Sequence, residues 1–170
     1  LYVQNFEQNR QTSVEPRISA VYQAGTRDRF SIASGLHSQT SPLFVHQYRF
    51  RDDATGQYRQ PNQMLGFMKS FQVVAGYQRT LTENLRLKTE AYYQYLYDVP
   101  VSLSHDTGAH AYSIVNTGAD YNFYALDSTV NKGSGRNYGV ELSLEKFVHK
   151  GYYFLANVSL FRSFYTAADG

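Results

Sequence analysis

The sequence predicts an all-β fold, an antiparallel β-meander of about six long strands. Apolar and polar residues alternate over several stretches of ten or more residues, which is the period of a strand with two different faces. The composition holds 16 tyrosines and 11 phenylalanines, and both residue types favour strands. Even the stretch richest in helix formers, "NLRLKTEAYYQYLYD", places its apolar residues at every second position.

The alternation defines six strands joined by connections of two very different lengths. Three connections are short, and two run to about thirty residues or more, well beyond ordinary loops. The expected strands are Ser13–Tyr22, Arg29–Ser38, Phe71–Leu81, Leu85–Asp98, Arg136–Val148 and Tyr152–Tyr165. The short connections are Ala24–Asp28, Thr82–Asn84 and His149–Gly151, and the long ones are Gln39–Ser70 and Val99–Gly135.

The last hairpin has a register that parity predicts, because residues on one face must lie opposite one another. Placing Val148 opposite Tyr152 leaves the three-residue loop His149–Gly151, with glycine in the left-handed position. This register sets Val140 opposite Leu160. Leu144 then lies opposite Ala156 in the same way.

The hairpin before it follows the same rule. Leu81 opposite Leu85 leaves the loop Thr82–Asn84, with Asn84 in the left-handed position, and sets Ala75 opposite Ala91. One face of this hairpin is apolar and the other is polar. The polar face carries Gln72, Gln78, Arg86, Lys88, Glu90 and Gln94.

A sheet with one apolar and one polar face fits two environments. In a soluble sandwich or lipocalin-like barrel the apolar face points inward. In a membrane barrel it points outward to lipid and the polar face lines the lumen. Long strands, alternating loop lengths, small apolar residues and tyrosines near the ends of the apolar stripes favour lipid. The small residues are Ala75, Ala91 and Ala156, and the tyrosines are Tyr77, Tyr97, Tyr138 and Tyr152.

Composition excludes several other classes of protein. The formal net charge is +2 without any run of lysine or arginine, which argues against a nucleic-acid partner. The absence of cysteine removes disulfide scaffolds, thiol catalysis and cysteine-ligated zinc. No stretch reaches the ~18 apolar residues of a membrane-spanning helix. The chain opens without methionine on "LYVQNFEQ" and stops at "YTAADG", so we expect a fragment of a longer protein.

No catalytic or metal site is expected. His105, Asp106 and His110 form the densest group of potential metal ligands, but their spacing on a loop is a poor metal signature. Glu141 and Glu145 lie four residues apart on one strand, about 13 Å, too far for the carboxylate pair of a glycosidase. We expect them to line the polar face, paired across strands to arginine or lysine. No cofactor is expected.

Several segments resemble a known family. "VEPRISAVYQ", "FSIASGLHSQTSPL", "LRLKTEAYYQYLYDVPVS" and above all "GRNYGVELSLEKFVHKGYYFLANVSLFRS" are similar to the barrel of TonB-dependent outer-membrane receptors of Bacteroidetes type. The resemblance covers nearly the whole chain, and the two long loops contribute least. It implies that the chain is the C-terminal part of such a β-barrel, a fragment of a large transmembrane barrel of about 22 strands.

The resemblance implies nutrient uptake across the cell outer membrane. Receptors of this family bind a scarce iron chelate, haem, cobalamin or glycan at extracellular loops and take energy from the TonB complex through an N-terminal plug. Neither a plug nor a TonB box is recognisable in this sequence. The long loops would be extracellular and the short turns periplasmic, and the expected partners are outer-membrane lipid, a small-molecule or glycan ligand, and TonB through the missing plug.

The long loops hold the candidate ligand-binding residues. Aromatic rings can stack on a sugar or chelate and arginines can supply charge, although the rings could instead pack the loops against each other. The candidates are Arg49, Arg51, Tyr58, Arg59, Tyr112, Tyr121 and Tyr124, with Tyr48, Phe50 and Phe123 as further aromatic neighbours.

Two other interpretations of the sequence stay open. A soluble β binding module, lipocalin-like or sandwich, is the first alternative, and an enzyme is the second. Excised from its barrel, the piece would have unpaired edges at Ser13–Tyr22 and Tyr152–Tyr165 and an apolar face, so we expect it to self-associate when isolated.

Overall fold

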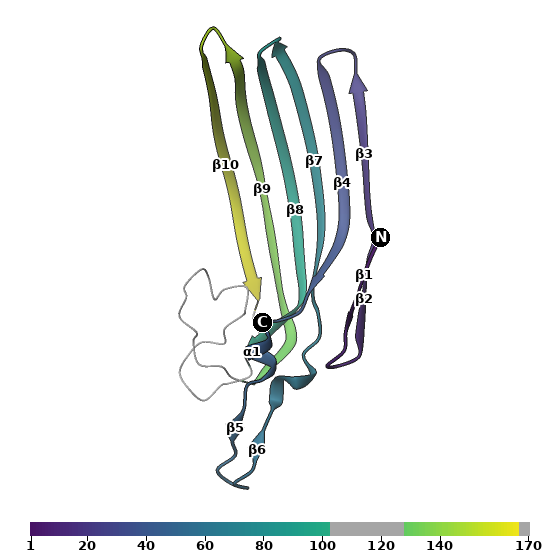
Figure 1. The fold of residues 1–170 in the computed structure, drawn as a ribbon, viewed down its shortest axis with the longest axis vertical. Helices are drawn as coiled ribbons and strands as arrows, with labels where there is room; N and C mark the ends of the chain where they lie inside the picture. Colours follow the sequence, from purple (N-terminus) through teal and green to yellow (C-terminus); the bar gives the residue numbers. More distant parts are fainter. Residues whose placement is uncertain (103–127, 167–170) are drawn as a thin grey trace.

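A computed structural model describes residues 1–102 and 128–166 of the chain. Its main feature is a single six-stranded antiparallel sheet, whose strands are neighbours in the same order as in the sequence (Figure 1). The all-β meander predicted from the sequence is therefore confirmed. The six strands are β3 (Arg17–Ala24), β4 (Asp28–Gln39), β7 (Met68–Thr82), β8 (Leu85–Ser102), β9 (Thr129–His149) and β10 (Tyr152–Thr166).

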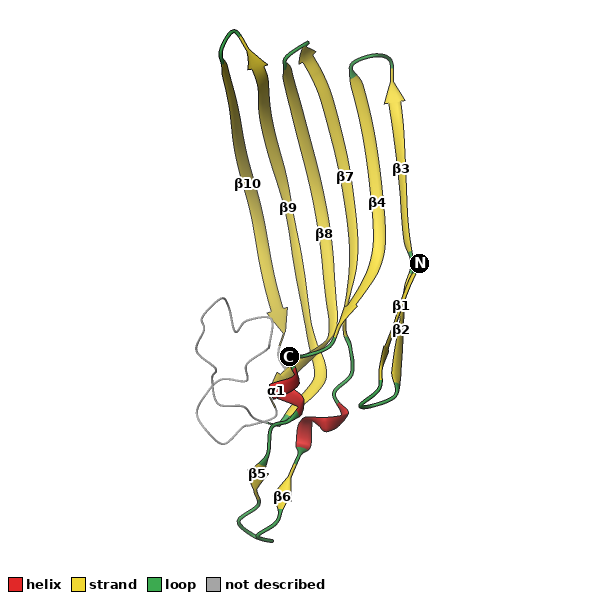
Figure 2. Ribbon diagram, in the orientation of Figure 1, coloured by secondary structure: helices red, strands yellow, loops and turns green. Residues whose placement is uncertain are grey.

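The smaller elements gather at one end of this sheet. Figure 2 shows the three short turns together at the opposite end, which we call the turn end, while the connection between β4 and β7 lies at the other end, the loop end. The loop end holds two small hairpins and two short helices. They are β1 (Tyr2–Phe6) with β2 (Gln11–Glu15), β5 (Phe50–Arg51) with β6 (Tyr58–Arg59), α1 (Leu43–His46) and the 3₁₀ helix η1 (Pro61–Met64).

The expected strand Ser13–Tyr22 is wrong as a single element, because it divides at Pro16. Proline has no N–H to donate to a ladder, so the strand ends before it. The carbonyl of Pro16 still accepts a hydrogen bond from the N–H of Leu36, at 3.0 Å. The first half of the segment becomes β2, which pairs with β1, and the second half becomes β3.

The expected loop Val99–Gly135 is also too long at both ends. Strand β8 continues to Ser102 and β9 begins at Thr129, and the two pair as far as these residues. The register shifts beside Asp98, whose φ is 55°, so the two-residue period of the sequence breaks there. Val99 and Val101 are fully buried beyond this bulge.

The turns of both parity-registered hairpins are shorter than expected. His149 pairs with Tyr152, which leaves Lys150 and Gly151 as a two-residue turn with φ of 55° and 81°. A register shift just after the turn restores the expected pairs Leu144 with Ala156 and Val140 with Leu160.

In the β7–β8 hairpin, Thr82 pairs with Leu85, so Glu83 and Asn84 form the turn. Asn84 does not have the positive φ that we expected. Ala75 lies opposite Ala91 as predicted.

A small core packs the loop end. The buried apolar residues of the described chain are Val45, Leu65, Phe67, Val99 and Val101. Asn62 is buried beside them, and its side-chain oxygen accepts a hydrogen bond from the N–H of Thr129, at 2.8 Å. Asn131 accepts from the N–H of Gly66 at 2.8 Å and donates to the carbonyl of Asp98 at 2.7 Å. These bonds fix the segment around η1 onto the loop end of the sheet.

Candidate functional site

One face of the six-stranded sheet is apolar from edge to edge, and we call it the apolar face. Its central row of cross-strand partners is entirely aliphatic: Ala20, Ile32, Ala75, Ala91, Val140 and Leu160. These side chains are open to the surroundings, with Val140 48% and Leu160 73% exposed. The smaller elements lie at the loop end, so no described element forms a second layer over this row (Figure 1).

Charged residues bound this apolar face at both ends. On β7, Lys69 and Arg79 lie ten residues apart, and the four residues of the same face between them are Phe71, Val73, Ala75 and Tyr77. On β9, Arg136 and Lys146 are again ten residues apart, and the residues between them are Tyr138, Val140, Leu142 and Leu144. The uncharged band therefore has the same length on both strands. On β9 it lies two residues closer to the turn end than on β7.

Aromatic rings concentrate near both limits of the band. Towards the turn end, Phe30 and Tyr77 are cross-strand partners with ring centroids 5.0 Å apart, and the Tyr77 hydroxyl donates to Asp28 at 2.7 Å. Towards the loop end, Tyr95 stacks on Tyr97 at 5.9 Å. An amphipathic ring suits a boundary between an apolar and a polar medium.

The opposite face, the polar face, carries charges at the height where the apolar face has none. Glu90 and Glu141 are direct partners on β8 and β9, adjacent in sequence to Ala91 and Val140. Lys88 pairs with Glu90 at 2.6 Å. The two faces of the same strands thus differ in polarity at the same height.

A ladder of side-chain amides crosses four strands of the polar face. Ser163 donates to Asn137 at 2.6 Å, Asn137 donates to Gln94 at 2.8 Å, and Gln94 donates to Ser70 at 3.0 Å. Gln72 donates to the same Ser70 hydroxyl at 3.2 Å. These neutral groups satisfy one another across the sheet.

The two glutamates singled out in the sequence differ in their partners. Glu145 forms an ion pair with Arg86 on β8, which confirms the expected cross-strand pairing. Glu141 lies opposite Glu90 and accepts a hydrogen bond from Ser159 at 3.5 Å, so its expected cationic partner is wrong. Arg86 lies directly opposite Glu145 in the register, whereas the row of Glu141 contains no cation.

The β5–β6 hairpin brings together three of the candidate ligand-binding residues. Arg51 lies opposite Tyr58, and Arg59 forms an ion pair with Asp52 at 2.6 Å. The Nε of Arg51 donates to the carbonyl of Gly56 at 3.3 Å. Hydrogen bonding from the N–H of Ala54, together with the charge of Arg59, lowers the pKa of Asp52.

The remaining candidates divide into two groups. Arg49 is exposed immediately before this hairpin, between Tyr48 and Phe50, whose rings stack at 6.2 Å. Tyr112, Tyr121 and Tyr124 lie outside the described residues, as do Phe123, His105, Asp106 and His110. Within the described residues no group of three metal-ligating side chains forms.

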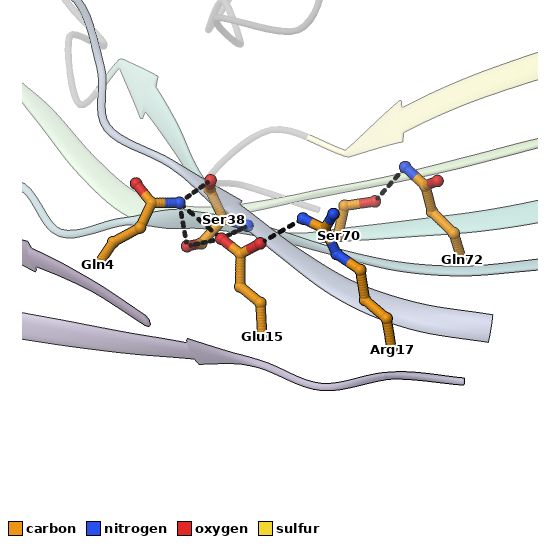
Figure 3. A network of polar contacts seen from close by, with 6 residues as sticks. All are labelled: Gln4, Glu15, Arg17, Ser38, Ser70 and Gln72. Carbon is orange, nitrogen blue, oxygen red and sulfur yellow. Dashed lines mark hydrogen bonds and ion pairs between the residues drawn. The ribbon is translucent and has the colours of Figure 1, made fainter. Parts of the chain in front are cut away.

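Sequence reasoning missed a carboxylate that the fold buries. Glu15 at the end of β2 is 2% exposed, and its oxygens accept hydrogen bonds from the N–H of Ser38 at 3.0 Å, the Ser38 hydroxyl at 2.8 Å and Gln4 at 2.6 Å. Arg17 forms an ion pair with it at 2.8 Å (Figure 3). Burial by itself raises the pKa of Glu15, but these partners outweigh it and lower the pKa to about 2.

His46 is the other polar residue that the loop-end core encloses. It is fully buried, its ring lies 5.0 Å from that of Phe6, and its nitrogens face the backbone of Asn62 and Ser41 without reaching hydrogen-bond geometry. Burial lowers its pKa, which favours the neutral ring. It acts as a packing residue. The alternation of apolar and polar residues in the sequence does not indicate that this histidine is buried.

Comparison with known proteins identifies no relative. No family model matches the chain, and neither a curated protein nor a solved structure matches it. Among the described residues no helix is long and apolar enough to cross a membrane.

Proposed function

We propose that the chain is part of the wall of an outer-membrane β-barrel, and that the barrel belongs to a TonB-dependent receptor for a scarce nutrient. The observation that carries the membrane part is the difference between the two faces at one height. The apolar face is exposed and uncharged between limiting charges that lie ten residues apart, while the polar face carries Lys88, Glu90 and Glu141. A soluble sheet would expose these faces the other way round.

The length of the uncharged band fits a bilayer. Ten residues of strand span about 33 Å, and the 35–45° tilt of strands in membrane barrels reduces this to a height of about 25 Å. That is the height of the apolar band on outer-membrane barrels. The aromatic residues at its limits would lie at the level of the lipid headgroups.

The receptor part of the proposal rests on the resemblance described above and on the distribution of loops. Among the described residues, the long connection between β4 and β7 and the β1–β2 hairpin lie at one end of the sheet, with three short turns at the other (Figure 1). The exposed arginines and aromatic residues of the β5–β6 hairpin offer charge and stacking surfaces to a chelate or glycan. In this proposal the loop end is extracellular, and energy is supplied through TonB.

Cysteine labelling tests the membrane placement directly, since the chain has no cysteine of its own. Val140→Cys and Glu141→Cys are neighbours on opposite faces and form a matched pair. In the natural polypeptide that contains this chain, reconstituted in lipid vesicles, a fluorophore on residue 140 should be quenched strongly by nitroxide-labelled lipid tails. The same fluorophore on residue 141 should be quenched several-fold less.

Equal quenching at the two positions would contradict the placement, and a monodisperse preparation without detergent would favour a soluble β binding module instead. The uptake step has its own test. A strain that lacks the protein should lose growth on one class of source among iron chelates, haem, cobalamin and glycans. Unchanged growth on all of them would argue against a receptor.

A further inference from the structure

Two arginines lie on the apolar face, at the limit of the uncharged band nearest the loop end. Arg136 on β9 and Arg162 on β10 share this face with Tyr138 and Leu160, and both are exposed. Within the described part of the chain neither guanidinium forms an ion pair. By contrast, the two charged residues that β7 contributes to this face have acidic partners. Lys69 pairs with Asp98 at 2.9 Å, and Arg79 lies 3.7 Å from Asp28.

The register makes the two arginines neighbours across the β9–β10 pair. Arg136 lies opposite Phe164 and Arg162 lies opposite Tyr138, so the two arginines are diagonal neighbours across the β9–β10 pair. Diagonal neighbours have their Cα atoms about 7–8 Å apart. One tetrahedral anion can therefore accept hydrogen bonds from both side chains.

Aromatic rings limit the freedom of Arg136. The guanidinium of Arg136 lies over the ring of Phe164, 4.9 Å from its centroid, and Phe164 stacks on Tyr138 at 6.2 Å. Tyr95 lies opposite Arg136 on the other side. A guanidinium held over a ring keeps its N–H edge free for an oxyanion.

We propose that Arg136 and Arg162 bind the phosphate of an anionic membrane lipid, whose acyl chain lies on the aliphatic row at Val140 and Leu160. The inference rests on the proposed membrane placement. The charge of the two arginines is complementary to the phosphate. Their position at the edge of the uncharged band puts them at the depth of the headgroups, where an unpaired guanidinium would otherwise lack a counter-charge.

Retention of lipid in native mass spectrometry tests the proposal. The natural polypeptide that contains this chain is mixed in detergent with phosphatidylglycerol, or with a galactosyl diacylglycerol that has the same tails and no phosphate. Phosphatidylglycerol should be retained in preference to the galactolipid. The double variant Arg136→Gln and Arg162→Gln should lower the affinity for phosphatidylglycerol by at least about tenfold and leave the galactolipid unchanged.

Arg29→Gln is the matched control, because Arg29 is exposed on the polar face of the same sheet without an ion pair among the described residues. It should retain phosphatidylglycerol like the unchanged protein. Competition by inorganic phosphate alone at similar concentration, or equal retention by the double variant, would overturn the proposal. If residue 140 is quenched by lipid while the double variant behaves normally, the lipid site fails and the membrane placement stands.

Discussion

Glu15 shows how far the chemistry of a single residue depends on chain segments that are remote in sequence. Its donors come from Gln4, Arg17 and Ser38, which belong to three different strands (Figure 3). The alternation of the sequence carries no sign of this cluster, because every member is an ordinary polar residue of a strand or turn. The cluster attaches the β1–β2 hairpin to the loop end of β4.

Glu15→Gln should loosen that hairpin. The amide keeps the shape of the side chain but loses the charge that four hydrogen bonds recognise, and we expect a local loss of about 2 kcal/mol. Hydrogen exchange of the β1 and β2 amides measures this loss. Glu7→Gln is the control, since Glu7 is exposed. Unchanged exchange in the Glu15 variant would show that the cluster does not hold the hairpin.

The same residue predicts a pH dependence of the hairpin. The pKa of Glu15 is lowered from 4.5 to about 2 in the folded chain, so its carboxylate stabilises the folded state above pH 4.5. That contribution should be lost progressively as the pH falls from 4.5 towards 2. The protection factors of the β1 and β2 amides, which correct for the pH dependence of intrinsic exchange, should fall over this window in the unchanged chain and stay constant in the Glu15→Gln variant.

At the scale of elements, the sequence predicts the middle of each strand better than its ends. The pairs Ala75 with Ala91 and Val140 with Leu160 follow from parity, because a slip of one residue would exchange the two faces. Parity does not predict the turns, because a bulge beside a turn changes the turn length and leaves the register of the strands unchanged. Nor does it predict the extension of β8 to Ser102, because the ladder is irregular between Leu96 and Pro100, where Asp98 has a positive φ.

The candidate site was predictable in the same uneven way. The apolar face is visible in the sequence, and so is the long loop that contains Arg51, Tyr58 and Arg59. The β5–β6 hairpin inside that loop was not predicted. The arginine pair of β9 and β10 is not, because Arg136 and Arg162 meet only when the register is known. The burial of Glu15 depends on contacts between strands that are far apart in sequence.

Gly139 provides a test of the β9–β10 pair. A Cβ at this position would lie 2.7 Å from the carbonyl oxygen of Leu160 and 2.9 Å from the Tyr92 hydroxyl, so one of the two strands must move. Gly139→Ala should destabilise the sheet by about 1–3 kcal/mol in urea unfolding from lipid vesicles. Ser143→Ala on the same face of β9 is the control, and an equal midpoint for the two variants would contradict the close approach.

At the scale of the whole molecule, the described sheet has two open edges and an open apolar face. β10 is exposed along its full length, and β3 forms the other edge. The chain produced by itself in water should therefore form oligomers, measured by light scattering at micromolar concentration. Val158→Lys with Leu160→Lys should reduce the association by charging the apolar face, and a monomer in both cases would contradict the prediction.

The displacement of the uncharged band between β7 and β9 has a geometrical consequence. The band moves by two residues between β7 and β9. These strands are separated by two steps, from β7 to β8 and from β8 to β9, so the band moves by one residue per step. A rise of about 3.3 Å per residue against a spacing of about 4.8 Å between strands corresponds to an inclination of about 35°. A bilayer plane drawn through the band would thus cross the strands at the tilt that barrel closure requires. In the proposed barrel, the charged side chains that limit the band on β7 and β9 would follow this shear of one residue per strand.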